Sequence, residues 1–243
     1  NEYNAMRLMF ASDDLDPMDL AQRGHINHLL KRAVQMGVPA IRAIQMATIS
    51  PANYFGLDSS IGAIFPGAMP DLVVAPDLIN FDPSMVLHHG RIVFNDGQIL
   101  ESGRASKRFL KPSINVKLPN AEAIAIRNQP GKLCRAISLI PGQVLTNEIL
   151  FKPKEKDGLV ITSVSQNIAK VAVFERHHGS GAFACGFVHG FGLKKGAFGS
   201  SVAHDSHNII VVGMTDEEII KVAQRIRNND GGQFALADGK LAD

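Results

Sequence analysis

Cysteine is scarce in this chain of 243 residues, which has only Cys134 and Cys185. Two cysteines cannot build a disulfide scaffold, so we expect a reducing, cytoplasmic compartment. The absence of a C-x-x-C pair excludes a zinc ribbon. Long hydrophobic runs are also lacking. The longest strongly apolar run, residues 209–212, is far shorter than the roughly 20 residues of a membrane-spanning helix. The sequence therefore gives no reason to expect a membrane protein.

An excess of charge of one sign is lacking too. The chain has 25 Lys+Arg and 23 Asp+Glu, for a net charge of +2, whereas proteins that bind nucleic acids concentrate Lys and Arg on one face. Hydrophobic residues make up 45% and charged residues 20% of the chain, which is typical of globular proteins and excludes disorder and collagen-like repeats. We therefore expect a small-molecule substrate, and neither nucleic acid nor a membrane as partner.

The chain begins Asn1-Glu2-Tyr3, without Met and without the basic and apolar regions of a signal peptide. Apolar residues 8–10 are typical of a short buried strand, and the acidic turn Asp13-Asp14 follows. A single strand at this point has no partner strand nearby in the sequence. We therefore expect the chain to be part of a longer protein.

Residues 1–58 are predicted to form this strand and then a series of helices. Asp16-Pro17 is a typical helix start, with Asp at the N-cap and Pro at the first helical position. A second helix is predicted over residues 25–36, where apolar residues recur at helical spacing and Gly37 stands at the C-cap. Shorter helices are expected to follow from Pro39 onwards.

Residues 59–104 have a different texture, with short apolar runs between glycines and prolines. His89-Gly90 and Asp96-Gly97 are typical hairpin turns and predict a small antiparallel sheet. The polar residues 101–112 are interpreted as a linker.

Residues 105–243 again have the pattern of strands, followed by one clear helix. The helix is predicted from a capping box, with Thr215 at the N-cap and Glu218 three residues later. Strands are predicted at residues 114–118, 123–126, 136–140, 159–164, 169–174 and 208–212.

Asp13-Asp14 is the first candidate for chemistry, because it follows a predicted buried strand and precedes helices. In α/β barrels catalytic groups gather at that end of a strand, and a carboxylate there can bind a divalent metal or move a proton. The alternative is that these residues only form a helix-capping turn.

His204-Asp205-Ser206-His207 is the densest polar cluster of the sequence. Two histidines three residues apart with an Asp between them could bind zinc or manganese, and the alternative is a turn whose side chains satisfy backbone groups. His177-His178 is a weaker candidate, because neighbours on a strand point to opposite faces. Residues 179–199 are rich in glycine but lack a nucleotide-binding motif. We interpret these glycines as strand positions that allow close backbone approach or bulges.

Taken in order, these segments resemble the later part of the adenine deaminases, members of the metal-dependent amidohydrolase superfamily. The most specific segment is residues 200–209, which contain His-Asp-Ser-His-Asn. The other segments that carry the resemblance are residues 10–14, 24–26, 43–48, 51–52, 62–67, 71–74, 173–178 and 186–188.

The resemblance implies an α/β plus β fold in three parts. Residues 1–58 would be the last strand and helices of a (β/α)8 barrel, residues 59–104 a small β-sandwich segment, and residues 105–243 a C-terminal α+β domain. The implied activity is the hydrolysis of adenine to hypoxanthine and ammonia by metal-activated water. The implied cofactor is a divalent metal, manganese or iron, with zinc as a further candidate, and the complete protein is expected to be a homo-oligomer.

The resemblance also assigns roles to residues. Asp13 is the implied metal ligand and catalytic proton carrier, since it matches the Asp that ends the eighth barrel strand of the superfamily. The accessory or substrate-side candidates are Asp14, His25, His204, Asp205 and His207.

The sequence also departs from the family pattern. It contains no His-x-His motif, although the superfamily has one on its first barrel strand, and Asn27 and Pro70 replace more usual residues. We therefore expect the isolated chain to be inactive. Two alternatives stay open: a non-catalytic binding or assembly module, or an amidohydrolase that acts on another cyclic amide.

Overall fold

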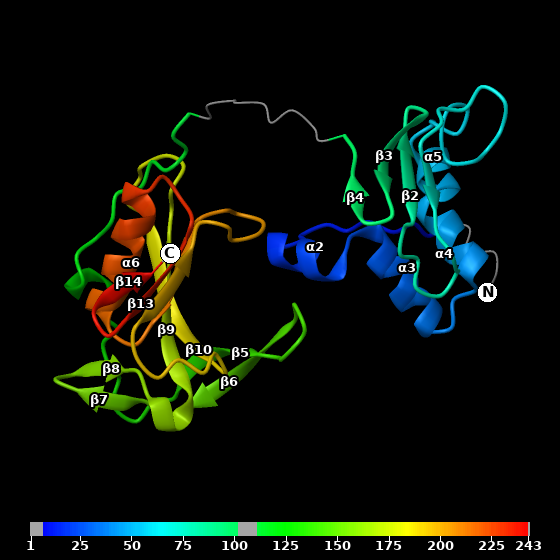
Figure 1. The fold of residues 1–243 in the computed structure, drawn as a ribbon. Helices are drawn as coiled ribbons and strands as arrows, with labels where there is room; N and C mark the ends of the chain where they lie inside the picture. The colour runs from blue at the N-terminus through cyan, green and yellow to red at the C-terminus, as the bar shows by residue number, and fades with distance from the viewer. Residues whose placement is uncertain (1–6, 102–110, 243) are drawn as a thin grey trace. The chain divides into compact units, whose positions relative to one another are not determined.

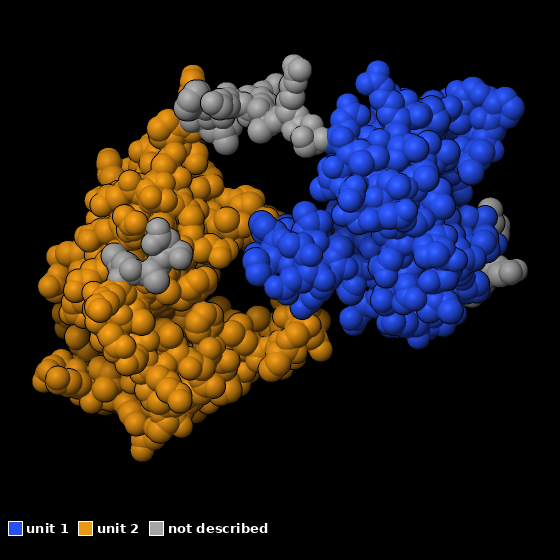
Figure 2. Space-filling view, in the orientation of Figure 1, with its two compact units in different colours: residues 1–107 blue, residues 108–243 orange. Residues whose placement is uncertain are grey.

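The computed structural model describes residues 7–101 and 111–242. The chain divides into two compact units, residues 1–107 and residues 108–243, which are coloured separately in Figure 2. Most of the predicted linker, residues 101–112, lies outside the described residues. Each unit is described by itself.

The described part of unit 1 contains four short helices, which the sequence predicted in this order. The side chain of Asp16 caps the first of them by accepting a hydrogen bond from the amide of Met18 at 2.8 Å, and Pro17 occupies the first helical position. The helices are α2 (Pro17–Arg23), α3 (Ile26–Gln35), α4 (Ala40–Ala47) and α5 (Ile49–Tyr54).

Residues 8–10, predicted as a buried strand, are neither paired nor buried within the described part of this chain. These residues pair with no other strand in the described part of the chain, and Leu8 is 54% exposed. The amide of Phe10 instead donates a hydrogen bond to the carbonyl of Met46 at 2.9 Å. A strand needs neighbouring backbones to pair with, and an apolar run cannot supply them by itself.

A four-stranded antiparallel sheet follows the helices in unit 1, as the hairpin turns predicted. Both turn pairs have the positive φ angles of a type I′ hairpin: 48° and 77° at His89 and Gly90, and 43° and 85° at Asp96 and Gly97. In sheet order the strands are β1 (Leu72–Val74), β2 (Met85–His88), β3 (Arg91–Asn95) and β4 (Gln98–Ile99).

Unit 2 is built on an eight-stranded sheet of mixed direction. Every described neighbour pair in it is antiparallel except β10 with β5. A separate two-stranded hairpin is formed by β7 (Lys154–Lys156) and β8 (Leu159–Ile161). In sheet order the strands are β14 (Lys240–Ala242), β13 (Gln233–Ala237), β11 (Ala197–Ser200), β12 (Ile209–Gly213), β9 (Ile168–Phe174), β10 (Phe183–His189), β5 (Cys134–Leu139) and β6 (Thr146–Phe151).

Helix α6 (Asp216–Asn228) packs against one face of this sheet (Figure 1). It begins where the capping box predicted, since the hydroxyl of Thr215 accepts a hydrogen bond from the amide of Glu218 at 3.2 Å. The fully buried Ile219, Val222 and Ile226 belong to the main core. Each such side chain stabilises the fold by roughly 1.5–3 kcal/mol relative to an exposed one. No helix among residues 7–101 and 111–242 is long and apolar enough to cross a bilayer.

The strands predicted at residues 114–118 and 123–126 are wrong. The first segment has no regular secondary structure, and the second contains the short 3-10 helix η1 (Glu122–Ile124). Their apolar side chains are nevertheless buried, since Val116 is 8% exposed and Ile124 1% exposed, both in the main core. The hydrophobic pattern therefore predicted burial correctly but not strand pairing.

Candidate functional site

Asp13 and Asp14 lie on the exposed segment that precedes α2. The backbone of Asp13 has a φ of 48°, a left-handed conformation that Asp tolerates better than most residues. The alternative interpretation was that Asp13 and Asp14 only form a helix-capping turn. The N-cap of α2 is instead Asp16. The Asp13 carboxylate is therefore placed at the surface of unit 1 and is not used to begin the helix.

A carboxylate suits a divalent metal, but one ligand does not hold a catalytic ion. Catalytic zinc sites use three protein ligands and leave a position for water or substrate. Among the described residues, Asp13 belongs to no group of three His, Cys, Asp or Glu side chains close enough to share an ion. The described part of this chain therefore gives Asp13 no complete set of ligands for a catalytic metal.

His25 is the N-cap residue of α3, where its side chain makes no capping hydrogen bond. Its backbone amide donates to the side-chain oxygen of Asn27 at 2.9 Å. His25 is exposed, so its ring is accessible on the same unit as Asp13.

The predicted cluster at residues 204–207 forms a turn between β11 and β12 in unit 2. The rings of His204 and His207 lie 4.7 Å apart between centroids in an edge-to-face arrangement at 74°. His207 has a left-handed φ of 51°, and its amide donates to the carbonyl of Ala203 at 2.5 Å. Asp205 is exposed at the tip of this turn. The structure thus brings the two imidazoles together.

This turn is joined to the segment that follows β9. The Nε2 atom of His177 lies 2.9 Å from the carbonyl oxygen of Ser206. The amide of Arg176 donates to the side-chain oxygen of Asn208 at 3.3 Å. Residues 175–178 and 204–208 are therefore neighbours in the fold, although about thirty residues separate them in the sequence.

Glu175 organises the segment that follows β9. One of its carboxylate oxygens accepts hydrogen bonds from the amides of His177, at 2.5 Å, and His178, at 2.9 Å, and the other accepts from the hydroxyl of Ser180 at 2.9 Å. Burial alone would raise the pKa of Glu175, but these hydrogen bonds together lower it to about 2. The carboxylate is therefore ionised at neutral pH and fixes the backbone next to the 204–208 turn.

Comparison with known proteins finds a family match in each unit. Residues 2–100 match the amidohydrolase family, and residues 143–243 match the adenine deaminase C-terminal domain. The chain is thus similar to adenine deaminases in both of its units. Adenine deaminase 2 of Carboxydothermus hydrogenoformans is 40% identical over 99% of this chain and 42% of its own length.

Two other adenine deaminases are similarly related. The protein from Methanothrix thermoacetophila is 40% identical over 99% of this chain, and that from Desulfatibacillum aliphaticivorans is 42% identical over 98% of it. The chain spans about 42% of the length of these curated relatives. The match of residues 2–100 to the amidohydrolase family implies a TIM-barrel-related fold and a divalent metal.

Sequence reasoning missed a second group of side chains that could bind a metal ion, on the small sheet of unit 1. Asp71, His88 and His89 each offer a ligand atom within 4.8 Å of the other two. His89 was recognised only as a turn residue. The pairing of β1 with β2 was the missing information, because it brings Asp71 next to His88.

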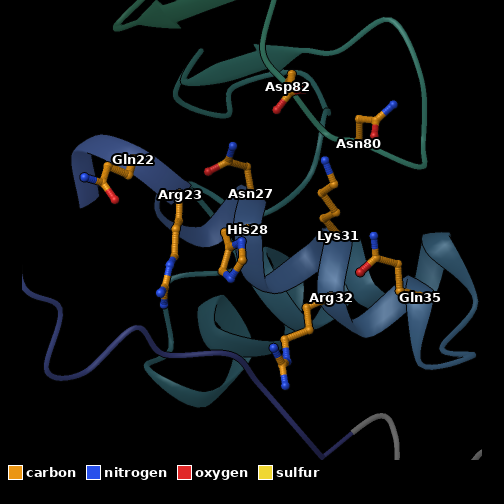
Figure 3. Close-up of a pocket in the computed structure, with 9 residues that line it drawn as sticks. All are labelled: Gln22, Arg23, Asn27, His28, Lys31, Arg32, Gln35, Asn80 and Asp82. Atoms are coloured by element: carbon orange, nitrogen blue, oxygen red, sulfur yellow. The ribbon is translucent and has the colours of Figure 1, made fainter. Parts of the chain in front are cut away.

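A cleft of about 310 Å³ lies beside α2 and α3, lined with polar and basic side chains (Figure 3). Lys31 extends toward Asn80, whereas Arg23 and Arg32 extend away from it. Arg23 is already paired with Asp19 at 3.2 Å. The cleft includes none of the residues that the sequence predicted as functional.

Proposed function

We propose that a protein of its relatives' length containing this chain hydrolyses adenine to hypoxanthine and ammonia. The observation that carries the proposal is the match to curated adenine deaminases, 40–42% identical over 98–99% of this chain. The structure adds support that sequence similarity alone does not give. Residues 175–178 and 204–208 form a single hydrogen-bonded cluster. These are two of the segments that carry the resemblance to the family.

The division of the chain is part of the proposal. Residues 1–58 would complete a barrel as its last strand and helices, and residues 59–104 would form the small β-sandwich segment. Residues 105–243 would be the C-terminal α+β domain. Exposed apolar side chains of the first part, among them Leu8, Tyr54 and Phe55 at 54%, 71% and 66% exposure, support this division because they offer surface for further packing.

Asp13 is the proposed catalytic residue. A divalent metal, manganese or iron with zinc as a further candidate, supplies an activated water for attack on C6 of adenine when it is bound. In the complete site the Asp13 carboxylate would hold one position on that metal, would accept a proton from the attacking water and would deliver it to the departing nitrogen. Adenine and water are thereby converted to hypoxanthine and ammonia.

Asp14, His25, His204, Asp205 and His207 are proposed as accessory or substrate-side residues. The paired rings of His204 and His207 offer nitrogen atoms that can exchange hydrogen bonds with a purine, and the carboxylate of Asp205 can accept one from an amine. Assembly into a homo-oligomer remains a prediction.

The protein encoded by the complete reading frame, supplied with manganese, tests this function. The expected result is release of one ammonia per adenine with formation of hypoxanthine. A protein that binds the metal and releases no ammonia from adenine would overturn the proposal. Turnover of hydantoins or dihydropyrimidines by the same preparation, without turnover of adenine, would favour the cyclic-amide alternative.

The histidine pair can be tested in the same assay. We expect H204Q/H207Q to raise KM for adenine more than it lowers kcat, because the pair is assigned to binding. H28Q, at a histidine of the cleft in unit 1, is the control and should leave both constants unchanged. An H204Q/H207Q protein with wild-type KM would contradict the assignment.

A further inference from the structure

The pairing of β1 with β2 places Asp71 opposite His88. The two strands are antiparallel, with Leu72 paired to Leu87, so the next residues outward are Asp71 and His88. The Nδ1 atom of His88 and the Oδ1 atom of Asp71 lie 3.0 Å apart. Seventeen residues separate the two in the sequence, and only the strand register brings them into contact.

The hairpin turn adds a second histidine on the same side. His89 has a left-handed φ of 48°, so its ring is not directed to the opposite face, as it would be for the next residue of a regular strand. The rings of His88 and His89 lie 4.3 Å apart between centroids. The turn is fixed to the segment before β1, because the amide of Gly90 donates to the carbonyl of Pro70 at 3.0 Å.

We propose that Asp71, His88 and His89 bind a first-row divalent metal ion such as Zn²⁺ or Ni²⁺, with water in the remaining positions. Bonds of roughly 2.0–2.2 Å from one ion place its ligand atoms roughly 3–4 Å from each other. The three ligand atoms here already lie within 4.8 Å of one another, and one pair is at 3.0 Å. Small rotations of exposed side chains are enough to complete the site.

The ligand set determines which ions are favoured. Two imidazoles and one carboxylate suit zinc, nickel, cobalt and copper, whereas magnesium and calcium prefer sites made of oxygen atoms. The backbone amide of His89 donates to the Oδ1 atom of Asp71 at 2.6 Å. This hydrogen bond holds the carboxylate in place, as outer-shell hydrogen bonds do in established metal sites.

Isothermal titration calorimetry of the 243-residue chain with Zn²⁺ as the only added metal tests the proposal. We expect one ion per chain in a saturable step that excess Mg²⁺ does not compete. H88Q/H89Q should weaken this step at least about tenfold, and D71N should weaken it as well. Because all three side chains are exposed, both variants should still fold without zinc.

The matched control is H177Q/H178Q, which removes the other adjacent pair of histidines. Its rings lie 6.2 Å apart, and it is not part of a three-ligand group in the described chain. It should bind zinc as the wild type does. Wild-type affinity in H88Q/H89Q, or an equal loss in H177Q/H178Q, would overturn the proposal.

A second measurement needs no variant. Substoichiometric Ni²⁺ should broaden the ring-proton NMR signals of His88 and His89 before those of the other histidines, because the ion is paramagnetic and acts at short range. Earlier broadening at His204 and His207 would contradict the proposed site. Neither measurement depends on deaminase activity, so a failure of one proposal does not imply a failure of the other.

Discussion

Ile209 at the start of β12 is paired directly with Phe174 at the end of β9. Because the two strands are antiparallel, the residues before Ile209 and those after Phe174 leave the sheet at the same end of this strand pair. This pairing explains why residues 204–208 and 175–178 form one cluster. The strand register thus positions two of the segments on which the sequence resembles adenine deaminases.

The low pKa of Glu175 predicts an acid-dependent loss of stability. Its folded value of about 2 lies below the ordinary 4.5, so ionised Glu175 stabilises the fold fully above about pH 4.5. That contribution is lost as the pH falls from there toward 2. Urea unfolding at several pH values between 7 and 3 should show a steeper decline for the wild type than for E175Q. Identical slopes would contradict the role assigned to this carboxylate.

Gly199 is predicted to tolerate no side chain. A Cβ atom there would lie 2.7 Å from Val222 Cγ1 and 2.9 Å from Val211 Cγ2, in the closely packed core beneath α6. Gly199→Ala should therefore lower the free energy of unfolding by about 1–3 kcal/mol. Gly186→Ala is the matched control, because a Cβ at Gly186 in β10 meets nothing within 4 Å. Denaturant unfolding followed by circular dichroism would compare them, and equal stabilities would refute the packing argument.

Lys170 and Asp216 form a buried ion pair between β9 and α6. The Nζ atom of Lys170 lies 2.5 Å from the Asp216 carboxylate, and the two side chains are 4% and 22% exposed. D216N leaves the ammonium group buried without its partner and should cost about 3–5 kcal/mol. K170M should cost less, because the Asp216 carboxylate is more exposed and lies at the N-terminus of a helix.

Chemical denaturation of the two single variants and of K170M/D216N measures the coupling within this pair. The double variant should be more stable than D216N, since it buries no unpaired charge. A double variant whose loss equals the sum of the two single losses would show that the pair is not coupled.

The sequence predicted elements that depend on local chemistry. The capping residues Asp16 and Thr215 begin helices as expected, and the His89-Gly90 turn is a hairpin. These features were predictable because each involves only residues close together in the chain. The polar strand β7 (Lys154–Lys156) has no hydrophobic pattern to predict it, and its pairing with β8 comes from the fold.

The sites were less predictable than the helices and turns. Sequence reasoning selected residues 204–207 as a cluster, and the structure brings His204 and His207 together. It missed the group of Asp71, His88 and His89, because that group depends on the β1–β2 register. Asp13 was a candidate from its position after a predicted strand, and the family resemblance then assigned its role. That catalytic role stays a prediction.

The 243-residue chain on its own is predicted to release no ammonia from adenine. Within the described residues Asp13 shares its surroundings with no two further metal ligands, and a catalytic ion needs about three. An ammonia assay of the purified chain with manganese checks this expectation. Measurable metal-dependent deamination by the chain alone would show that its residues complete a site without further sequence.

Replacement of Asp13 in the protein encoded by the complete reading frame tests the central claim most directly. D13N removes the proposed proton carrier and metal ligand while nearly preserving side-chain size, and D82N is the control on the same unit. We predict that D13N lowers kcat for adenine at least about a hundredfold and that D82N leaves it unchanged. Wild-type turnover of adenine by D13N would contradict the account.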